Sequence, residues 1–123
     1  MNMNPYIIPL LKTTRIPAKY FDLQTRANKT ELVDVVCDVF KIEKESLLSK
    51  SRKREFVEAR KVVSWVGVEK LGLTLKYVGR DILNGRDHTT VIHAIKSFHD
   101  LYETEDGFRM KVDTIIQKLS EIR

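Results

Sequence analysis

Five consecutive polar residues, Arg86 to Thr90, come immediately before an apolar run at helical spacing that starts at Val91. A helix with this pattern is held on a core by its later turns, while its first turn projects into solvent. Asp87 could accept a hydrogen bond from cytosine N4, His88 could donate or accept, and Thr89 could contact a thymine methyl group or a phosphate. The pattern is typical of a helix that reads bases in the major groove, and equally of a capped, exposed helix start without a partner.

A second group of polar side chains is cationic and lies between residues 50 and 61. Within this stretch only Glu55 and Glu58 oppose its six basic residues, which are Lys50, Arg52, Lys53, Arg54, Arg60 and Lys61. Arginine can form paired hydrogen bonds to a phosphate or enter a narrow minor groove. A charged run can also be a solvated face, but two such features in one small basic chain favour a nucleic-acid partner.

The elements that would position these groups all have helical patterns. Asn28 and Glu31 form a predicted capping box, Gly72 is suited to ending a helix, and Thr74 can cap the next one. Asn84-Gly85 predicts a tight turn before a helix capped by Asp87. Beside the short helix after Thr74, helices are expected over residues 28–41, 44–48, 54–71, 87–102 and 108–122. No segment alternates with period two, so we expect an all-α, compact multi-helix domain containing a helix-turn-helix.

The composition sets the broad class of the protein. The chain has 123 residues, a net charge of +5 and a pI of about 9.4, and 13 of its 22 basic residues lie between residues 41 and 96 against seven acidic ones. This length fits a single domain, and the charge suggests an anionic partner. The single cysteine, Cys37, lies among valines and is expected to be a buried, inert thiol in a reducing cytosol.

The first 27 residues differ in character from the rest. They contain all three prolines of the chain, so we expect an irregular N-terminal arm (1–27) ahead of the folded domain (28–123). The apolar run from Tyr6 to Leu11 is too short to span a membrane and has no basic residues before it, so neither a membrane anchor nor a secretory signal is expected. The predicted location is the cytoplasm, associated with the nucleoid.

Other chemistries have little support in the sequence. The three histidines are five and six residues apart, so no pair has the i, i+4 spacing of a metal clamp. The glycine pair Gly79 and Gly85 lacks the Gly-Lys-Ser/Thr of a P-loop. With no convergent acid and base either, we expect no metal, no cofactor, no bound nucleotide and no enzymatic activity.

Residues 84–94, Asn-Gly-Arg-Asp-His-Thr-Thr-Val-Ile-His-Ala, resemble the Gly-Gly-Arg-Asp-His-Thr-Thr-Val-Leu-His-Ala signature of the DNA-binding domain (domain IV) of the bacterial replication initiator DnaA. Residues 47–54 are similar to the basic loop of that family, and Ala59-Arg60-Lys61 stands where the family has Pro-Arg-Gln. The resemblance covers roughly residues 30–122. It implies a TrpR-like, DnaA domain IV-like fold and sequence-specific binding of double-stranded DNA, at DnaA-box-like sites, in replication initiation or its regulation.

The resemblance also implies individual roles. Arg52 would enter the minor groove, and Asp87, His88 and Thr89 would read bases in the major groove. The basic stretch adds two residues to the DNA-backbone contacts that the family implies, and together the expected backbone contacts are Lys50, Arg54, Arg60, Lys61, Lys76, Thr90 and His93.

The chain departs from the family pattern in three ways. It has no ATPase module, its turn after Leu71 is one residue shorter, and its stretch 79–85 is one residue longer. The N-terminal methionine and the unfamiliar first 27 residues favour a stand-alone protein over an excised piece of a longer one. They also leave open a protein-interaction module that binds the initiator or another replication protein, with the run Tyr6–Leu11 as anchor, dimer seam or simply packed on the domain.

Overall fold

The computed structural model describes residues 27–122, and this part of the chain contains helices and no strand. Its α-helices are α2 (Lys29–Phe40), α3 (Lys44–Leu48), α4 (Arg54–Trp65), α5 (Leu75–Tyr77), α6 (His88–Thr104) and α7 (Asp106–Ser120). Two π-helical turns continue α4 and α5, η2 (Val66–Lys70) and η3 (Val78–Ile82). The predicted all-α fold class is therefore confirmed. The predicted arm, apart from Ala27, and the run Tyr6–Leu11 lie outside the described residues.

The helix ends follow the capping signals. The Asn28 side chain accepts from the Glu31 backbone N–H at 2.9 Å, and the Glu31 carboxylate accepts from the Asn28 N–H at 2.9 Å, which completes the predicted capping box. Gly72 ends the α4–η2 helix with φ +70°, a left-handed conformation that glycine adopts without strain. Thr74 accepts from the Tyr77 N–H at 3.0 Å and starts α5 as predicted.

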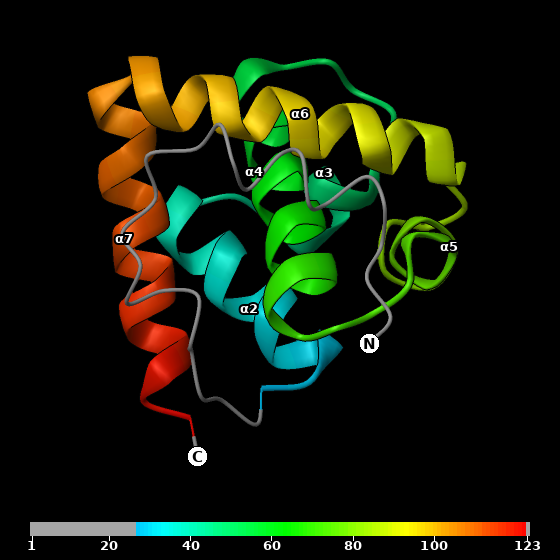
Figure 1. The fold of residues 1–123 in the computed structure, drawn as a ribbon, viewed down its shortest axis with the longest axis horizontal. Helices are drawn as coiled ribbons and strands as arrows, with labels where there is room; N and C mark the ends of the chain where they lie inside the picture. Colours follow the sequence, from blue (N-terminus) through cyan, green and yellow to red (C-terminus); the bar gives the residue numbers. More distant parts are fainter. Residues whose placement is uncertain (1–26, 123) are drawn as a thin grey trace.

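Helix α4 runs through the centre of the molecule with α2 and α6 packed against it, and α7 packs on α2 and α6 (Figure 1). Trp65 of α4 is fully buried and stacks on Phe98 of α6, with ring centroids 4.4 Å apart and planes 11° from parallel. Offset aromatic stacking of this kind adds to the burial of two large apolar side chains. The pair joins the central helix to the helix that carries the polar first turn.

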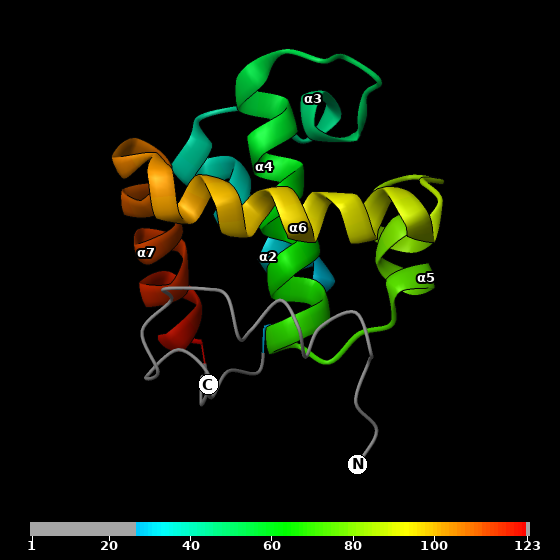
Figure 2. The same ribbon diagram turned by 45° about the horizontal axis from the view of Figure 1, so that its top comes forward.

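The helix-turn-helix consists of α5 with η3, a tight turn, and α6 (Figures 1 and 2). Asn84 and Gly85 both have positive φ, 61° and 91°, and form the predicted turn. Gly79 lies directly against it, because the Gly79 carbonyl accepts from the N–H groups of Gly85 at 3.1 Å and Arg86 at 2.8 Å. The turn therefore folds back onto the first helix of the motif.

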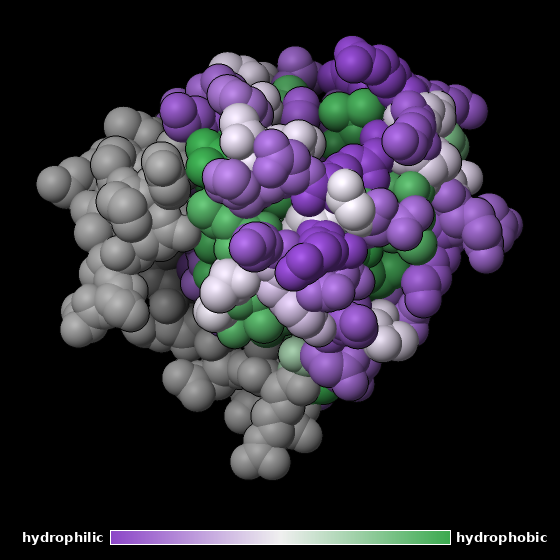
Figure 3. Space-filling view, turned by 90° about the vertical axis from the view of Figure 1, so that its right-hand side faces the viewer, coloured by the Kyte–Doolittle hydropathy of each residue, from purple (hydrophilic) through white to green (hydrophobic). Residues whose placement is uncertain are grey.

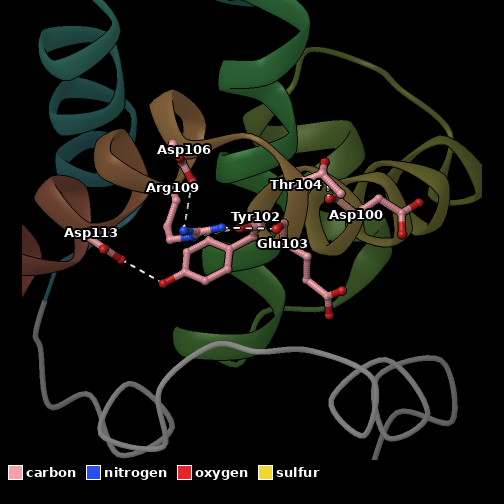
Figure 4. Close-up of polar contacts among 7 residues, drawn as sticks. All are labelled: Asp100, Tyr102, Glu103, Thr104, Asp106, Arg109 and Asp113. Carbon is pink, nitrogen blue, oxygen red and sulfur yellow. Dashed lines mark hydrogen bonds and ion pairs between the residues drawn. The ribbon is translucent and has the colours of Figure 1, made fainter.

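The α6–α7 corner is tighter than the sequence predicts. The helices expected over 87–102 and 108–122 are separated by Glu105 alone, because α6 extends to Thr104 and α7 begins at Asp106. Arg109 closes the corner by donating to the carbonyls of Tyr102 at 2.9 Å and Glu103 at 3.1 Å, while its guanidinium lies 5.6 Å from the centroid of the Tyr102 ring (Figure 4). These bonds satisfy carbonyls at the end of α6 that have no partner within the helix.

Cys37 is buried in α2, as expected, and burial raises the pKa of its thiol, which keeps it protonated and unreactive. None of the helices in the described part of the chain is long and apolar enough to cross a membrane.

Candidate nucleic-acid interface

The first turn of α6 stands in solvent. Asp87, His88, Thr89 and Thr90 are all exposed, whereas Val91 is fully buried. This is the change from polar, exposed residues to apolar, buried ones that the sequence pattern predicts. The space-filling view of the end of the molecule that carries α5 and the start of α6 is dominated by hydrophilic residues (Figure 3).

Asp87 occupies the N-cap position of α6, but its side chain does not cap the helix. Its backbone carbonyl accepts from the N–H groups of Thr90 and Val91, while its carboxylate lies 3.1 Å from His88 Nδ1. The prediction that Asp87 caps this helix was therefore right in position and wrong for the side chain. The carboxylate oxygens stay available to an outside donor.

A groove of about 510 Å³ lies between the basic loop (residues 49–53), α4 and α6. Figure 2 shows this loop at the top of the view, where it joins α3 to α4. Six of the residues expected to contact DNA line this groove, and they are Lys50, Arg52, Arg60, Lys61, Thr90 and His93. Residues from distant parts of the sequence are thus brought to one side, next to the exposed turn of α6.

Arg60 is buried and its guanidinium faces the chain itself. Nε donates to the Leu47 carbonyl at 2.7 Å, Nη1 to the Ser51 carbonyl at 2.8 Å, and Nη2 to the carbonyls of Ser46 at 3.2 Å and Ser49 at 2.7 Å. Burial lowers the pKa of Arg60, and the neighbouring Arg86 lowers it further. All three nitrogens therefore hold the chain around the loop in place. The sequence predicts a phosphate contact for Arg60 and does not indicate this structural role.

Arg54 lies away from the groove. Its Nε is 2.8 Å from the buried carboxylate of Glu58, and its Nη2 is 3.3 Å from the Glu105 carboxylate, at the corner between α6 and α7. The hydrogen bond to Glu58 and the charge of that carboxylate raise the pKa of Arg54. The side chain is nevertheless exposed, as is Lys76 on α5, which does not line the groove either.

Arg86 is the residue that the sequence analysis left without a role. It is half-buried in the same groove, and its guanidinium donates to the Leu83 carbonyl at 2.8 Å and the Ser49 carbonyl at 2.7 Å. Burial lowers its pKa as well. Its contact with Ser49 bridges 37 positions of sequence, so no local pattern could have indicated it.

The arrangement is a cationic groove beside a polar helix start, and the described residues contain no cluster of three His, Cys, Asp or Glu side chains that could hold a metal ion. The family model described as the bacterial dnaA protein helix-turn-helix matches residues 30–97, a span that includes the basic loop and the first turns of α6. The chain belongs to this DnaA helix-turn-helix family.

Whole DnaA proteins are among its relatives. The chain is similar to chromosomal replication initiator proteins DnaA from Bacteroides fragilis, with 34% identity over 82% of the chain and 21% of the relative, and from Flavobacterium psychrophilum, with 40% identity over 70% and 18%. The DnaA of Ureaplasma parvum matches 92% of the chain at 28% identity and is covered over 24% of its length. The chain thus spans about a fifth of the length of these DnaA relatives.

Proposed function

We propose that this DnaA-like domain, residues 28–123, binds double-stranded DNA sequence-specifically. The first turn of α6 enters the major groove, and the basic loop enters the adjacent minor groove. The observation that carries this proposal is the placement of an exposed, polar helix start beside a groove lined by cationic side chains. DNA binding needs both parts, because phosphate contacts supply affinity and base-edge contacts supply specificity.

Three side chains of the first turn read bases in this proposal. Asp87 accepts from cytosine N4 with the carboxylate that does not cap the helix. His88 hydrogen-bonds a base edge in the tautomer that the neighbouring carboxylate favours, and the methyl and hydroxyl groups of Thr89 contact a thymine methyl or a phosphate. Arg52 reads the width of the minor groove from the basic loop.

The DNA backbone between the two grooves lies along the cationic groove of the protein. Lys50, Lys61, Thr90 and His93 line it and are proposed to hold phosphates, with Lys76 as a further contact from α5. Arg54 would bind a phosphate only on leaving the carboxylates of Glu58 and Glu105. Arg60 acts chiefly by holding the loop, since each of its nitrogens already donates to a carbonyl.

The names of the relatives, chromosomal replication initiator proteins, support a proposal for the biological setting. We propose a role in replication initiation or its control, at DnaA-box-like sites in the bacterial nucleoid, without enzymatic activity of this chain. A module that binds the initiator or another replication protein is the alternative, and competitor DNA would leave such binding unchanged.

Selection of bound sequences from a random pool of duplex DNA tests the proposal. We expect one enriched motif, and variants His88→Ala and Thr89→Ala should each lose about 1–3 kcal/mol of discrimination at one base pair. Arg52→Ala should relax the preference at one end of the motif. Thr114→Ala, whose hydroxyl bonds within α7, is the control. Equal affinity of wild type and variants for all sequences of the pool would refute sequence-specific reading.

A further inference from the structure

Arg86 connects the two parts of the proposed interface. Its Nη1 donates to the carbonyl of Leu83, in the turn that leads to α6, and its Nη2 donates to the carbonyl of Ser49, where the basic loop begins. One planar guanidinium therefore bridges the backbone before the major-groove helix and the backbone of the minor-groove loop. Both terminal nitrogens donate to the protein's own backbone, so the half-buried side chain has a structural role in this fold.

Arg60 completes the same junction from α4. The Ser49 carbonyl accepts from Arg60 Nη2 and from Arg86 Nη2, each at 2.7 Å, so that two guanidinium groups meet at one oxygen. A carbonyl oxygen has two lone pairs and can accept both bonds. The loop is thus attached to the central helix by Arg60 and to the helix-turn-helix by Arg86.

This junction places two positive charges side by side. Neither guanidinium has an ion pair with a carboxylate among residues 27–122, and the proximity of Arg86 contributes to lowering the pKa of Arg60. Charge repulsion and partial burial both oppose the arrangement. It is stable because the planar fork of arginine can bond two carbonyls at fixed geometry, which the single ammonium of lysine cannot do.

We propose that Arg86 is a positioning residue for DNA recognition, which fixes the basic loop relative to the first turn of α6 and so sets the spacing between the minor-groove and major-groove contacts. The inference rests on the proposed function. Reading two grooves at once requires both elements to be held within a fraction of an ångström by their supporting contacts. Arg86 supplies the only side-chain hydrogen bond that joins the turn before α6 to this loop within the described residues.

The first measurement needs no DNA. Amide hydrogen exchange should be faster in Arg86→Gln and Arg86→Lys at the loop amides of Ser51 and Lys53, which donate to hydroxyls within the loop, and unchanged in α4 and α7. Arg109→Gln is the matched control, because Arg109 also donates to two backbone carbonyls but at the α6–α7 corner. Faster exchange throughout the domain, or no increase in the exchange rate of the loop amides, would contradict a local positioning role.

The second measurement is a double-mutant cycle on the selected DNA site. Arg86→Gln should weaken binding about tenfold in the wild-type chain and less than about twofold in the Arg52→Ala chain. In the Arg52→Ala chain the minor-groove contact is already absent, so a mispositioned loop cannot weaken it further. The salt dependence should keep its slope, and Arg86→Lys should not restore affinity. A slope lower by about one, with rescue by lysine, would make Arg86 a phosphate contact and overturn the proposal.

The two proposals fail in different ways. Absence of duplex binding by the wild-type chain would refute the proposed function and, with it, the role of Arg86 in reading DNA. Specific binding by the wild type, together with additive effects of Arg86→Gln and Arg52→Ala, would refute only the positioning role. Widened tolerance of Arg86→Gln for sites with one base pair more or less between the two contacts would support it.

Discussion

Single side chains decide how the cationic groove is used. The same residue type has three different environments here, since Arg52 is exposed on the loop, Arg54 is paired with carboxylates, and Arg60 is buried against carbonyls. Their formal charge alone would predict the same role for all three arginines. A cation whose donors are not already held by the protein can contact a DNA phosphate and release the counterions condensed on the DNA, so we expect the groove's contribution to affinity to come from residues such as Arg52 and Lys61.

Lys61 is the clearest test at this scale. It lines the groove and, within the described part of the chain, has no carboxylate at ion-pair distance. Lys61→Ala should weaken binding to all DNA sequences alike and lower the slope of log affinity against log salt by about 0.9. Lys118→Ala is the control, because Lys118 lies on α7 with its Nζ 3.7 Å from Asp38. Binding titrations at several salt concentrations measure both, and an unchanged slope for Lys61→Ala would exclude a phosphate contact.

The residue types of the candidate site were predictable, but their partners were not. The polarity switch at Val91 predicts which side chains of α6 are exposed, because helical spacing determines burial. The hydrogen-bond partners of a guanidinium depend instead on which backbone carbonyls the fold brings near it. Arg60 and Arg86 both meet Ser49, 11 and 37 positions away, and no spacing rule covers such contacts.

At the scale of elements, the helix-turn-helix depends on a close approach between Gly79 and the turn. A Cβ atom added at Gly79 would lie 2.3 Å from the Arg86 carbonyl oxygen, a backbone atom that cannot move without opening the turn. Gly79→Ala should therefore destabilise the domain by at least about 1–3 kcal/mol and disrupt DNA binding. Urea unfolding and DNA titration measure the two effects.

Gly107→Ala is the matched control for this substitution. Gly107 lies in the first turn of α7, and a Cβ atom there would meet nothing within 4 Å. Alanine should stabilise the domain by about 0.4–1 kcal/mol, since it reduces the freedom of the unfolded chain in a conformation that it can adopt. Equal stability of the two variants would show that the turn does not need the close approach at Gly79.

Several element boundaries could be predicted, and those at Asn28, Gly72 and Thr74 rest on local capping chemistry. The helices α2 and α3 and the starts of α4 and α5 agree with expectation, while the π-helical turns η2 and η3 do not appear in a pattern of 3.6 residues per turn. A π turn accommodates one extra residue within a helix. The turn η3 overlaps the stretch 79–85, which the sequence predicts to be one residue longer than in the family, and a π turn would accommodate such an extra residue.

At the scale of the whole molecule, the part of the core formed by α7 lies apart from the candidate interface, because no residue of α7 lines the groove. Helix α7, which buries Ile115, packs against α2 and α6, while the groove lies between the basic loop, α4 and α6. Substitutions in the two regions should therefore have independent effects, because distant sites without shared partners contribute additively.

Thermal unfolding with and without DNA measures this separation. If only the folded chain binds, duplex DNA at 100 times its Kd should add about 2.7 kcal/mol to the free energy of unfolding. Ile115→Val should cost about 0.5–1.5 kcal/mol without DNA and keep the same gain from it. Lys61→Ala should behave in the opposite way. Its free energy of unfolding without DNA should be unchanged, and the increase on adding the same concentration of DNA should be smaller. Loss of the DNA-dependent gain in Ile115→Val would show that the core and the interface are coupled, because a methyl group in α7 would then influence a groove formed by other helices.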